Sequence, residues 1–269
     1  MAGMTYVYPV LSRRAGGVSL GLNLNPNNAC NWHCVYCQVP DLVRGKAPPI
    51  DLARLCAELR TFLDEIRRGT FMAEHAPPEA RQLKDLAFSG NGEPTSAADF
   101  ARIVMAVGDI RNQSGFDDTV PVRLITNGSL MGRSEVLAGV EALSSYGGEV
   151  WFKVDAARRA DVARINGVER SREQVLTHLE RCASACRTWI QTCLFAWDGQ
   201  LPDEAFLDAY LSLLEDAARF GIEGVLLYGV ARPSLQPEAP RVTAVPPDWL
   251  AEVGERITNK TGLTVSVSP

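Results

Sequence analysis

The sequence predicts an α/β protein in which helices cover a parallel sheet. Short apolar runs of strand length recur along the 269 residues, helical stretches separate them, and no internal repeat or interdomain linker interrupts the series. Repeated strand–helix units form a parallel sheet with the helices outside. We therefore expect one domain over 1–269, with an N-terminal segment at 1–18, the strand–helix core at 19–230 and a C-terminal extension at 231–269.

The order of the elements follows from the spacing of apolar residues and from the turn residues between them. The predicted strands are 19–24, 84–88, 122–126, 149–155, 189–195 and 224–230, with 263–267 as a closing strand. The predicted helices are 51–68, 97–111, 133–144, 171–186, 203–219 and 247–259. In parallel β/α barrels the active groups lie at the C-terminal ends of the strands, so the residues just after each strand are the candidates for a site.

Composition narrows the class of protein and its compartment. The chain is 46% hydrophobic and 22% charged, which is ordinary for a globular protein with a sizeable core. Residues 1–14 hold too short an apolar run for a secretory signal, and no run of about 18 apolar residues occurs, so we expect a cytoplasmic protein without a membrane partner. With a net charge of -5 and a pI of about 5.4, no Lys/Arg run resembles a nucleic-acid footprint, and we expect no DNA partner.

Three of the seven cysteines lie close together in NNACNWHCVYCQVP, residues 27–40. Cys30, Cys34 and Cys37 have the spacing C-x3-C-x2-C. A disulfide framework does not fit a cytoplasmic chain with an odd cysteine count. The three positions would share one stripe of a helix, but the apolar periodicity ends at Pro26 and Asp41, so the segment reads as a loop.

A metal site remains, and the number of ligands indicates its kind. Structural zinc takes four ligands, and His33, adjacent to Cys34, is awkwardly placed as the fourth. A 4Fe-4S cluster held by three thiolates leaves one iron with an open position where chemistry can occur. A non-catalytic iron–sulfur or zinc protein stays as an alternative.

The cysteine loop, with Tyr36 just before the last cysteine, resembles the cluster loop of the radical S-adenosylmethionine (SAM) enzymes. The resemblance implies a partial (β/α)6 TIM-like barrel and one 4Fe-4S cluster on Cys30, Cys34 and Cys37. It also implies that the open iron binds SAM, which is reductively cleaved to a 5'-deoxyadenosyl radical that abstracts hydrogen from a substrate. An electron donor such as flavodoxin or ferredoxin is the implied partner.

A glycine-rich turn follows the predicted strand in LKDLAFSGNGEPT. Glycine lets the backbone approach a ligand closely, and the acid supplies a negative charge. The turn resembles the GGE motif of the family, which implies that its backbone and acid hold the SAM ammonium group. An ordinary strand-to-helix turn with a solvated acid is the alternative reading. The residues concerned are Gly90, Asn91, Gly92 and Glu93.

Two further strand ends carry polar candidates. Thr126 and Asn127 end the strand in PVRLITNGSL, and the resemblance implies that Asn127 contacts the SAM ribose. Lys153 and Asp155 lie two apart on the strand in GEVWFKVDAA, where a lysine on a buried strand needs a partner. Either they form a structural ion pair, or they take catalytic roles and contact SAM carboxylate or substrate. Tyr36 and Tyr228 are expected near the adenine.

At finer grain the chain resembles relatives of the tRNA 4-demethylwyosine synthases, which implies a tRNA base as substrate. Radical modification of a small molecule or peptide is the alternative. Arg13, Arg14 and Arg232 are candidates for binding an acidic substrate, or else form surface ion pairs. The remaining cysteines are expected in the core, although a second cluster stays open for three of them, Cys182, Cys186 and Cys193.

Overall fold

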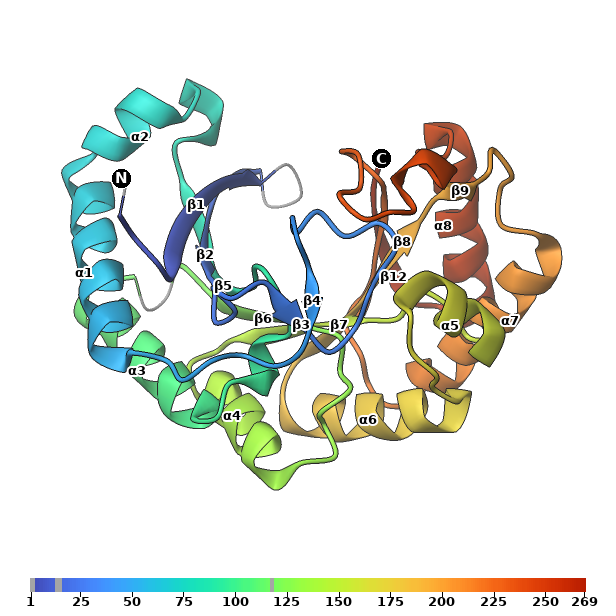
Figure 1. Cartoon of the computed structure of the whole chain (residues 1–269), viewed down its shortest axis with the longest axis horizontal. Helices are drawn as coiled ribbons and strands as arrows, with labels where there is room; N and C mark the ends of the chain where they lie inside the picture. Colours follow the sequence, from blue (N-terminus) through green and yellow to red (C-terminus); the bar gives the residue numbers. More distant parts are fainter. Residues whose placement is uncertain (1–2, 13–15, 117–118) are drawn as a thin grey trace.

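An eight-stranded sheet, curled into an open half-barrel, forms the centre of the molecule (Figure 1). The computed structural model describes residues 3–12, 16–116 and 119–269. All neighbouring strands run parallel except the first pair, β1 and β2, which is antiparallel. In spatial order the strands are β1 (Val7–Ser12), β2 (Gly17–Leu22), β5 (Leu83–Phe88), β6 (Val122–Thr126), β7 (Glu149–Lys153), β8 (Thr188–Leu194), β10 (Gly224–Gly229) and β12 (Thr264–Ser268). The predicted partial barrel is confirmed.

Helices line the convex side of the sheet (Figure 1). Each predicted helix is present, and local capping explains several boundaries: the Asp51 side chain accepts the Arg54 N–H at the first helix, and Ser171 and Gln174 form a capping box at the fourth. No helix among the described residues is long and apolar enough to cross a membrane. These helices are α1 (Leu52–Arg68), α3 (Phe100–Gln113), α4 (Ser134–Ser145), α6 (Arg172–Ala185), α7 (Glu204–Ala218) and α8 (Pro247–Thr261).

Several elements were not predicted. β1 falls in the expected N-terminal segment and contains Pro9, which an edge strand tolerates because one side of it lacks a partner. The helix α5 is short and rich in charge, so its apolar periodicity is weak. The others are the helix α2 (Thr70–His75), α5 itself (Arg159–Asn166), the pairs β3 (Ala29–Cys30) with β4 (Val43–Arg44) and β9 (Ala196–Trp197) with β11 (Val242–Thr243), and 3-10 turns at Pro78–Ala80, Pro94–Ser96 and Ala239–Arg241.

The two faces of the sheet differ in chemistry. Side chains alternate along each strand, so one set meets the helices and the other faces the inside of the half-barrel. The helix side is apolar and fully buried, as at Leu22, Phe88 and Phe152. The inner side carries charge: Arg123 pairs with Asp85 and, at 2.5 Å, with Glu149. The charged side chains of Asp85, Arg123 and Glu149 therefore share the inner face of the barrel.

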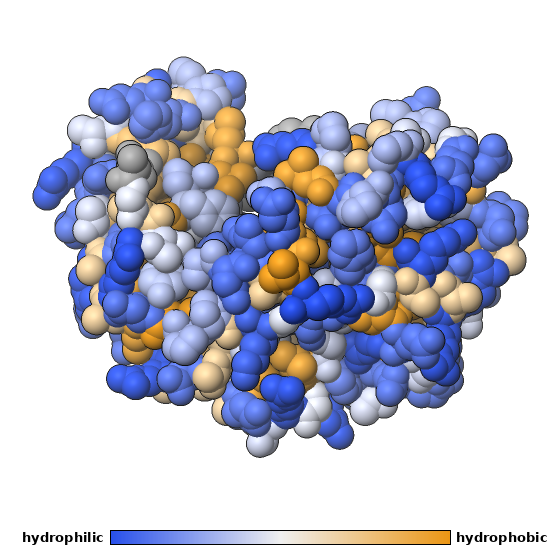
Figure 2. All heavy atoms as spheres, in the orientation of Figure 1, coloured by the Kyte–Doolittle hydropathy of each residue, from blue (hydrophilic) through white to orange (hydrophobic). Residues whose placement is uncertain are grey.

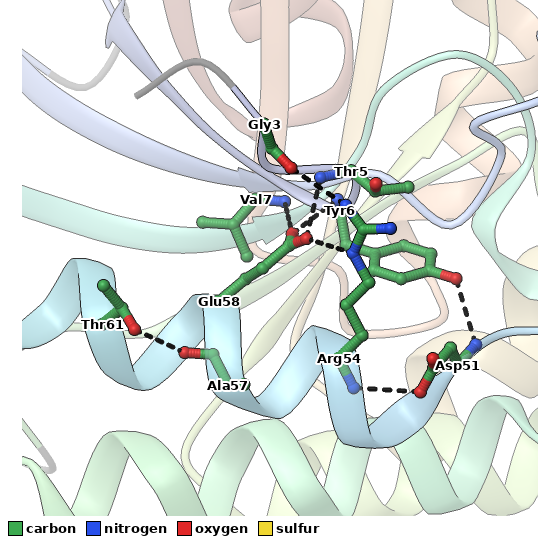
Figure 3. Close-up of polar contacts among 9 residues, drawn as sticks. All are labelled: Gly3, Thr5, Tyr6, Val7, Asp51, Arg54, Ala57, Glu58 and Thr61. Atoms are coloured by element: carbon green, nitrogen blue, oxygen red, sulfur yellow. Dashed lines mark hydrogen bonds and ion pairs between the residues drawn. The ribbon is translucent and has the colours of Figure 1, made fainter.

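Glu58 on α1 fastens the N-terminal strand to the helix layer (Figure 3). Its carboxylate accepts the backbone N–H groups of Thr5, Tyr6 and Val7 at 2.9, 2.8 and 3.2 Å, and Arg54 Nε donates to it at 2.9 Å. Burial alone would raise the pKa of Glu58, but these hydrogen bonds favour the charged form and lower it overall. The start of β1 is thus held by one carboxylate, in addition to the ladder that pairs β1 with β2.

Replacing Glu58 with glutamine is expected to lower the free energy of unfolding by about 1–2 kcal/mol, because an amide cannot accept from all four donors. In the wild type this stability is present above the ordinary glutamate pKa and is lost as the pH falls through the lowered pKa of the folded state. Urea denaturation between pH 3 and 7 measures both effects. The exposed Asp64→Asn change on the same helix is the control; equal losses in the two variants would contradict the anchoring role.

Candidate active site

A cavity of about 840 Å³ opens at the C-terminal ends of the parallel strands. Figure 2 shows the surface hollowed between the side of β1 and α2 and the side of the C-terminal segment, with apolar residues on the walls. The cavity brings together most of the predicted site residues from five separate parts of the chain. They are Cys30, Cys34, Tyr36, Cys37, Gly90, Asn91, Gly92, Glu93, Asn127, Lys153, Tyr228 and Arg232. Arg13 and Arg14 lie outside the described residues.

The cysteine segment is a loop, as predicted, and two other segments hold it. On one side His33 and Val35 donate their N–H groups to the carbonyls of Asn166 and Ile165, at the end of α5, both at 2.9 Å. On the other side the residues after β10 bind its backbone. Ser234 Oγ donates to Val35 O at 2.7 Å, Leu235 N to Cys37 O at 2.9 Å, and Gln236 Nε2 to Val39 O at 2.8 Å.

The three thiols face the same cavity and carry no disulfide. Burial raises the pKa of Cys30 to about 11 and that of Cys34 to about 12, so both are neutral until a metal displaces the proton. Each accepts a donor that would stabilise a bound thiolate: Trp32 N–H reaches Cys30 Sγ at 3.4 Å, and Asn166 Nδ2 reaches Cys34 Sγ at 3.3 Å.

The arrangement of the three thiols is compatible with a cluster. Among the described residues, no three His, Cys, Asp or Glu side chains converge closely enough to hold one metal ion. In an iron–sulfur cluster each cysteine binds a different iron, so the sulfurs need not converge on one point. The three free thiols on one cavity wall, with amide donors beside two of them, fit such a group.

Glu93 ties the glycine-rich turn to the next strand. Its Oε1 accepts the hydroxyls of Thr95 and Thr126, both at 2.6 Å, and its Oε2 accepts the Asn127 N–H at 2.7 Å. The side chain is 2% exposed, and this burial raises its pKa against the opposing effect of the hydrogen bonds. Glu93 is thus the acceptor at the junction of β5 and β6, which the reading as a solvated turn residue did not anticipate.

Replacing Glu93 with alanine is expected to lower the free energy of unfolding by about 2–3 kcal/mol, because two hydroxyls and two N–H groups, those of Thr95 and Asn127, lose their buried acceptor. Chemical denaturation measures the loss. Ser134→Ala, at an exposed site, serves as the control for a truncation without buried partners. An alanine variant as stable as the wild type would mean that water replaces the carboxylate and that the turn does not depend on it.

The two glycines of this turn allow a close approach of backbone segments. Gly90 has a φ of 131°, a conformation that side chains other than glycine rarely adopt. A Cβ on Gly92 would lie 2.1 Å from the carbonyl oxygen of Ala29, in the strand that begins the cysteine loop. The turn is therefore pressed against the cysteine loop, and neither glycine has a substitute that fits.

Of the two candidates after β6, one faces the cavity and the other does not. Asn127 lines it, with its Nδ2 donating to Asn31 Oδ1 at 2.8 Å and its Oδ1 accepting Ser129 N–H at 2.9 Å. Thr126 is absent from the cavity wall, since its hydroxyl is turned towards Glu93. The side chain of Thr126 therefore supports the turn.

Lys153 and Asp155 form an ion pair, with Nζ 3.7 Å from Oδ1. Burial alone would lower the pKa of Lys153, but the Asp155 carboxylate raises it overall, so the amine stays protonated. Its Nζ donates to Tyr228 OH at 3.2 Å and lies 4.8 Å from the centre of the Tyr36 ring. Both tyrosines thus lie beside the cation on the cavity wall, and their expected place near the adenine stays a prediction.

Asp155 is the centre of this network and lies outside the cavity lining. Its Oδ2 accepts Tyr36 OH at 2.5 Å and Asn166 Nδ2 at 2.7 Å, and its Oδ1 accepts the Cys193 N–H at 3.0 Å. Asn166 bridges Asp155 and Cys34. The carboxylate therefore connects the cysteine loop, α5 and β8, and acts as a positioning group.

The remaining cysteines separate into two locations. Cys182 and Cys186 are buried, the first on α6 and the second at its end, and neither lines the cavity. Cys193 is also buried but lines the cavity from β8, which its expected place in the core did not indicate.

Sequence reasoning also missed Asn166 and Gln191. For Asn166 the available cue was an Asn-Gly pair, which reads only as a turn.

An open parallel half-barrel with three free thiols and an anchored glycine-rich turn at its mouth is an arrangement typical of barrel enzymes whose active groups lie at the C-terminal ends of the strands. Comparison of the sequence with family models gives the particular family. The radical SAM superfamily model matches residues 24–210, and the chain belongs to this superfamily and is an enzyme of it. Membership implies SAM and an iron–sulfur cluster as cofactors, and a reductant as a partner.

Solved structures share this fold. The chain is similar to SuiB of Streptococcus suis bound to SAM, with a TM-score of 0.62, 12% identity and coverage of 93% of this chain and 50% of that one. It is similar to TYW1 with a lysine-pyruvate adduct bound, with a TM-score of 0.59, 17% identity and coverage of 91% and 74%. It is also similar to a radical SAM methyltransferase from Sphaerobacter thermophilus, with a TM-score of 0.63, 14% identity and coverage of 97% of this chain and 68% of that one. Identities this low show the fold alone.

Two curated proteins share part of the sequence. A stretch of 134 residues is 32% identical to UPF0026 protein MJ1312 of Methanocaldococcus jannaschii, covering 48% of this chain and 34% of that protein. A stretch of 128 residues is 30% identical to GTPase Obg of Brachyspira hyodysenteriae, covering 48% of this chain and 16% of that protein. The chain spans about a third or less of the length of these relatives.

Proposed function

We propose that this enzyme binds one 4Fe-4S cluster on Cys30, Cys34 and Cys37 and reductively cleaves SAM to form a 5'-deoxyadenosyl radical. The observation that carries the proposal is the path from Cys34 through Asn166 and Asp155 to Lys153, which joins the thiol loop to a cation on the same cavity. When bound, the cluster supplies the electron that breaks the sulfonium bond. We place the reaction in the cytoplasm, with flavodoxin or ferredoxin as the electron donor.

The protein residues would bind and orient the cofactor. The backbone of Gly90–Gly92, pressed against the cysteine loop, would receive the SAM ammonium group, while Glu93 keeps that turn in place. Asn127 at the cavity wall would contact the ribose. Lys153, held protonated, offers a positive charge to a carboxylate of SAM or of the substrate, and Tyr36 and Tyr228 flank it.

We further propose an RNA base, in a tRNA, as the substrate. The fold shared with TYW1 over 91% of the chain, together with the wyosine-synthase resemblance of the sequence, supports this choice. Arg232 is exposed and lines the cavity, where it would meet a phosphate or another anionic group at the entrance. Modification of a small molecule or peptide remains the second candidate, and a cavity of about 840 Å³ is large enough for such a substrate.

The test is anaerobic reconstitution followed by incubation with SAM and dithionite. We expect about four irons per chain and 5'-deoxyadenosine by chromatography. Addition of unmodified tRNA transcripts is expected to raise its yield and to change the mass of one nucleoside. A protein that takes up zinc and leaves SAM intact would refute the cleavage chemistry, while SAM cleavage indifferent to tRNA would refute the tRNA substrate alone.

A further inference from the structure

Gln191 has a buried hydrogen-bond donor without a partner inside the barrel. The side chain lies on β8, is 2% exposed and lines the large cavity. Within the described structure its Nε2 has no hydrogen-bond acceptor. A buried amide without a partner costs stability, so proteins keep one mainly where a ligand completes it.

The neighbours of Gln191 explain why no protein group satisfies it. In the sheet register its partners are Lys153 on β7 and Leu226 on β10. Leu226 has no polar atom in its side chain. Lys153 directs its Nζ towards Tyr228 OH and Asp155, which belong to the level of the cysteine loop. In the described part of the chain, Gln191 therefore keeps a free donor two residues before Cys193 on β8, the residue that pairs with Tyr228 in the sheet.

The charges nearby favour a neutral partner over an anion. Arg123, on the inner face, is already paired with two carboxylates, Asp85 and Glu149, and Lys153 is paired with Asp155. These two ion-pair groups contain three carboxylates and two cations. An anion at Gln191 would have to compete with these carboxylates for Arg123 and Lys153, whereas a carbonyl oxygen accepts the bond without needing a cation.

We propose that Gln191 determines specificity by donating from Nε2 to a neutral carbonyl oxygen of the substrate, of the amide or lactam type. This inference rests on the proposed function in taking the cavity as the substrate site. Anchoring of an anionic group by an arginine then applies at the entrance, where Arg232 lies, and the deep end of the cavity recognises an uncharged group.

The first test measures binding to the reconstituted, SAM-bound protein by calorimetric titration with three probes: uracil, N-acetylglycinamide and acetate. We expect uracil or N-acetylglycinamide to bind more tightly than acetate, the first indicating a lactam and the second an amide. Gln191→Met is expected to weaken the preferred probe about tenfold, the value of one hydrogen bond. Gln191→Glu, which keeps the shape but replaces the donor by an acceptor, is expected to weaken it at least as much.

Tightest binding by acetate, or neutral probes whose affinity does not change in either variant, would overturn the proposal. A second measurement covers the case of a structural role. Thr192, the next residue of β8, donates to Val154 O at 2.9 Å and contacts Tyr210 OH at 2.5 Å, so Thr192→Val is expected to lower the melting temperature by ~2–4 °C. Gln191→Met is expected to leave the melting temperature unchanged or raise it, and a loss as large as that of Thr192→Val would overturn the proposal.

These binding measurements need no radical and no reductant. If the neutral probes bind through Gln191 but no 5'-deoxyadenosine is formed, the proposed chemistry fails and the recognition role stands. If SAM is cleaved but the probes are indifferent to Gln191, the chemistry stands and the recognition role fails.

Discussion

A Cys34→Ala variant is expected to bind less than about one iron per chain and to form no detectable 5'-deoxyadenosine, whereas the wild type is expected to bind about four irons. Removal of one of three protein ligands leaves the cluster with two, and Cys34 is also the thiol that Asn166 connects to the Asp155 network. Iron and sulfide content, the visible absorption band and chromatography of SAM products measure the loss.

Cys182→Ala is the matched control, because Cys182 is a buried thiol on α6 that does not line the cavity. It is expected to lose some stability, since its sulfur fills a packed site, and to keep its full iron content. Iron retained at the wild-type level by Cys34→Ala would show that the three thiols do not act as a set. Equal iron loss in both variants would point to general unfolding.

Replacing Asp155 with asparagine is expected to lower the free energy of unfolding by about 2–3 kcal/mol, because Lys153 is left as a partly buried cation without its counter-charge. The same change removes the acceptor that holds Tyr36 OH and Asn166 Nδ2, so the cysteine loop loses one of its supports. Urea denaturation of the reconstituted protein under anaerobic conditions measures the stability, and the iron content measures the effect on the loop.

The double variant Lys153→Met with Asp155→Asn separates the two effects. Because the uncompensated charge is removed, we expect it to be more stable than Asp155→Asn alone, in a double-mutant cycle with a coupling energy of about 1–3 kcal/mol. Its iron content should remain reduced, since the contacts of Asp155 with Tyr36 and Asn166 are still altered. Additive single effects would show that the 3.7 Å pair between Lys153 and Asp155 contributes nothing to stability.

The features that could be predicted are those that depend on local sequence patterns. The fold follows from alternating strand and helix patterns, and the ends of parallel strands meet at one edge, which places the cysteine loop, Gly90–Glu93 and Lys153 together. The direction of a side chain was harder to predict. Thr126 and Asp155 were grouped with cofactor and catalytic residues, but the structure turns them away from the cavity, towards Glu93 and the Asn166 network.

What the sequence did not reveal depends on contacts between distant segments. Asn166 lies 132 residues from Cys34, and no local pattern connects them. Gln191 was visible as a polar residue in an apolar run, but its exposure to the cavity depends on the register that sets it beside Lys153. The strand β1 and the helix α5 were missed because a proline and a high charge content weaken the periodicity of short elements.

The hydrogen bonds from residues 234–236 to the cysteine loop have a consequence for how the protein is made. Ser234 and Val35, which form one of these bonds, are separated by 199 residues. During translation the three thiols leave the ribosome before residues 234–236 have been synthesised, so the cysteine loop of the nascent chain lacks these hydrogen bonds. Iron and sulfide that arrive before the last strands are synthesised would find the thiols on a loop that is not yet held in place. Iron and sulfide that arrive afterwards would find the thiols already positioned. Insertion of a cluster that needs the fastened loop would therefore have to wait until Ser234 has been added to the chain.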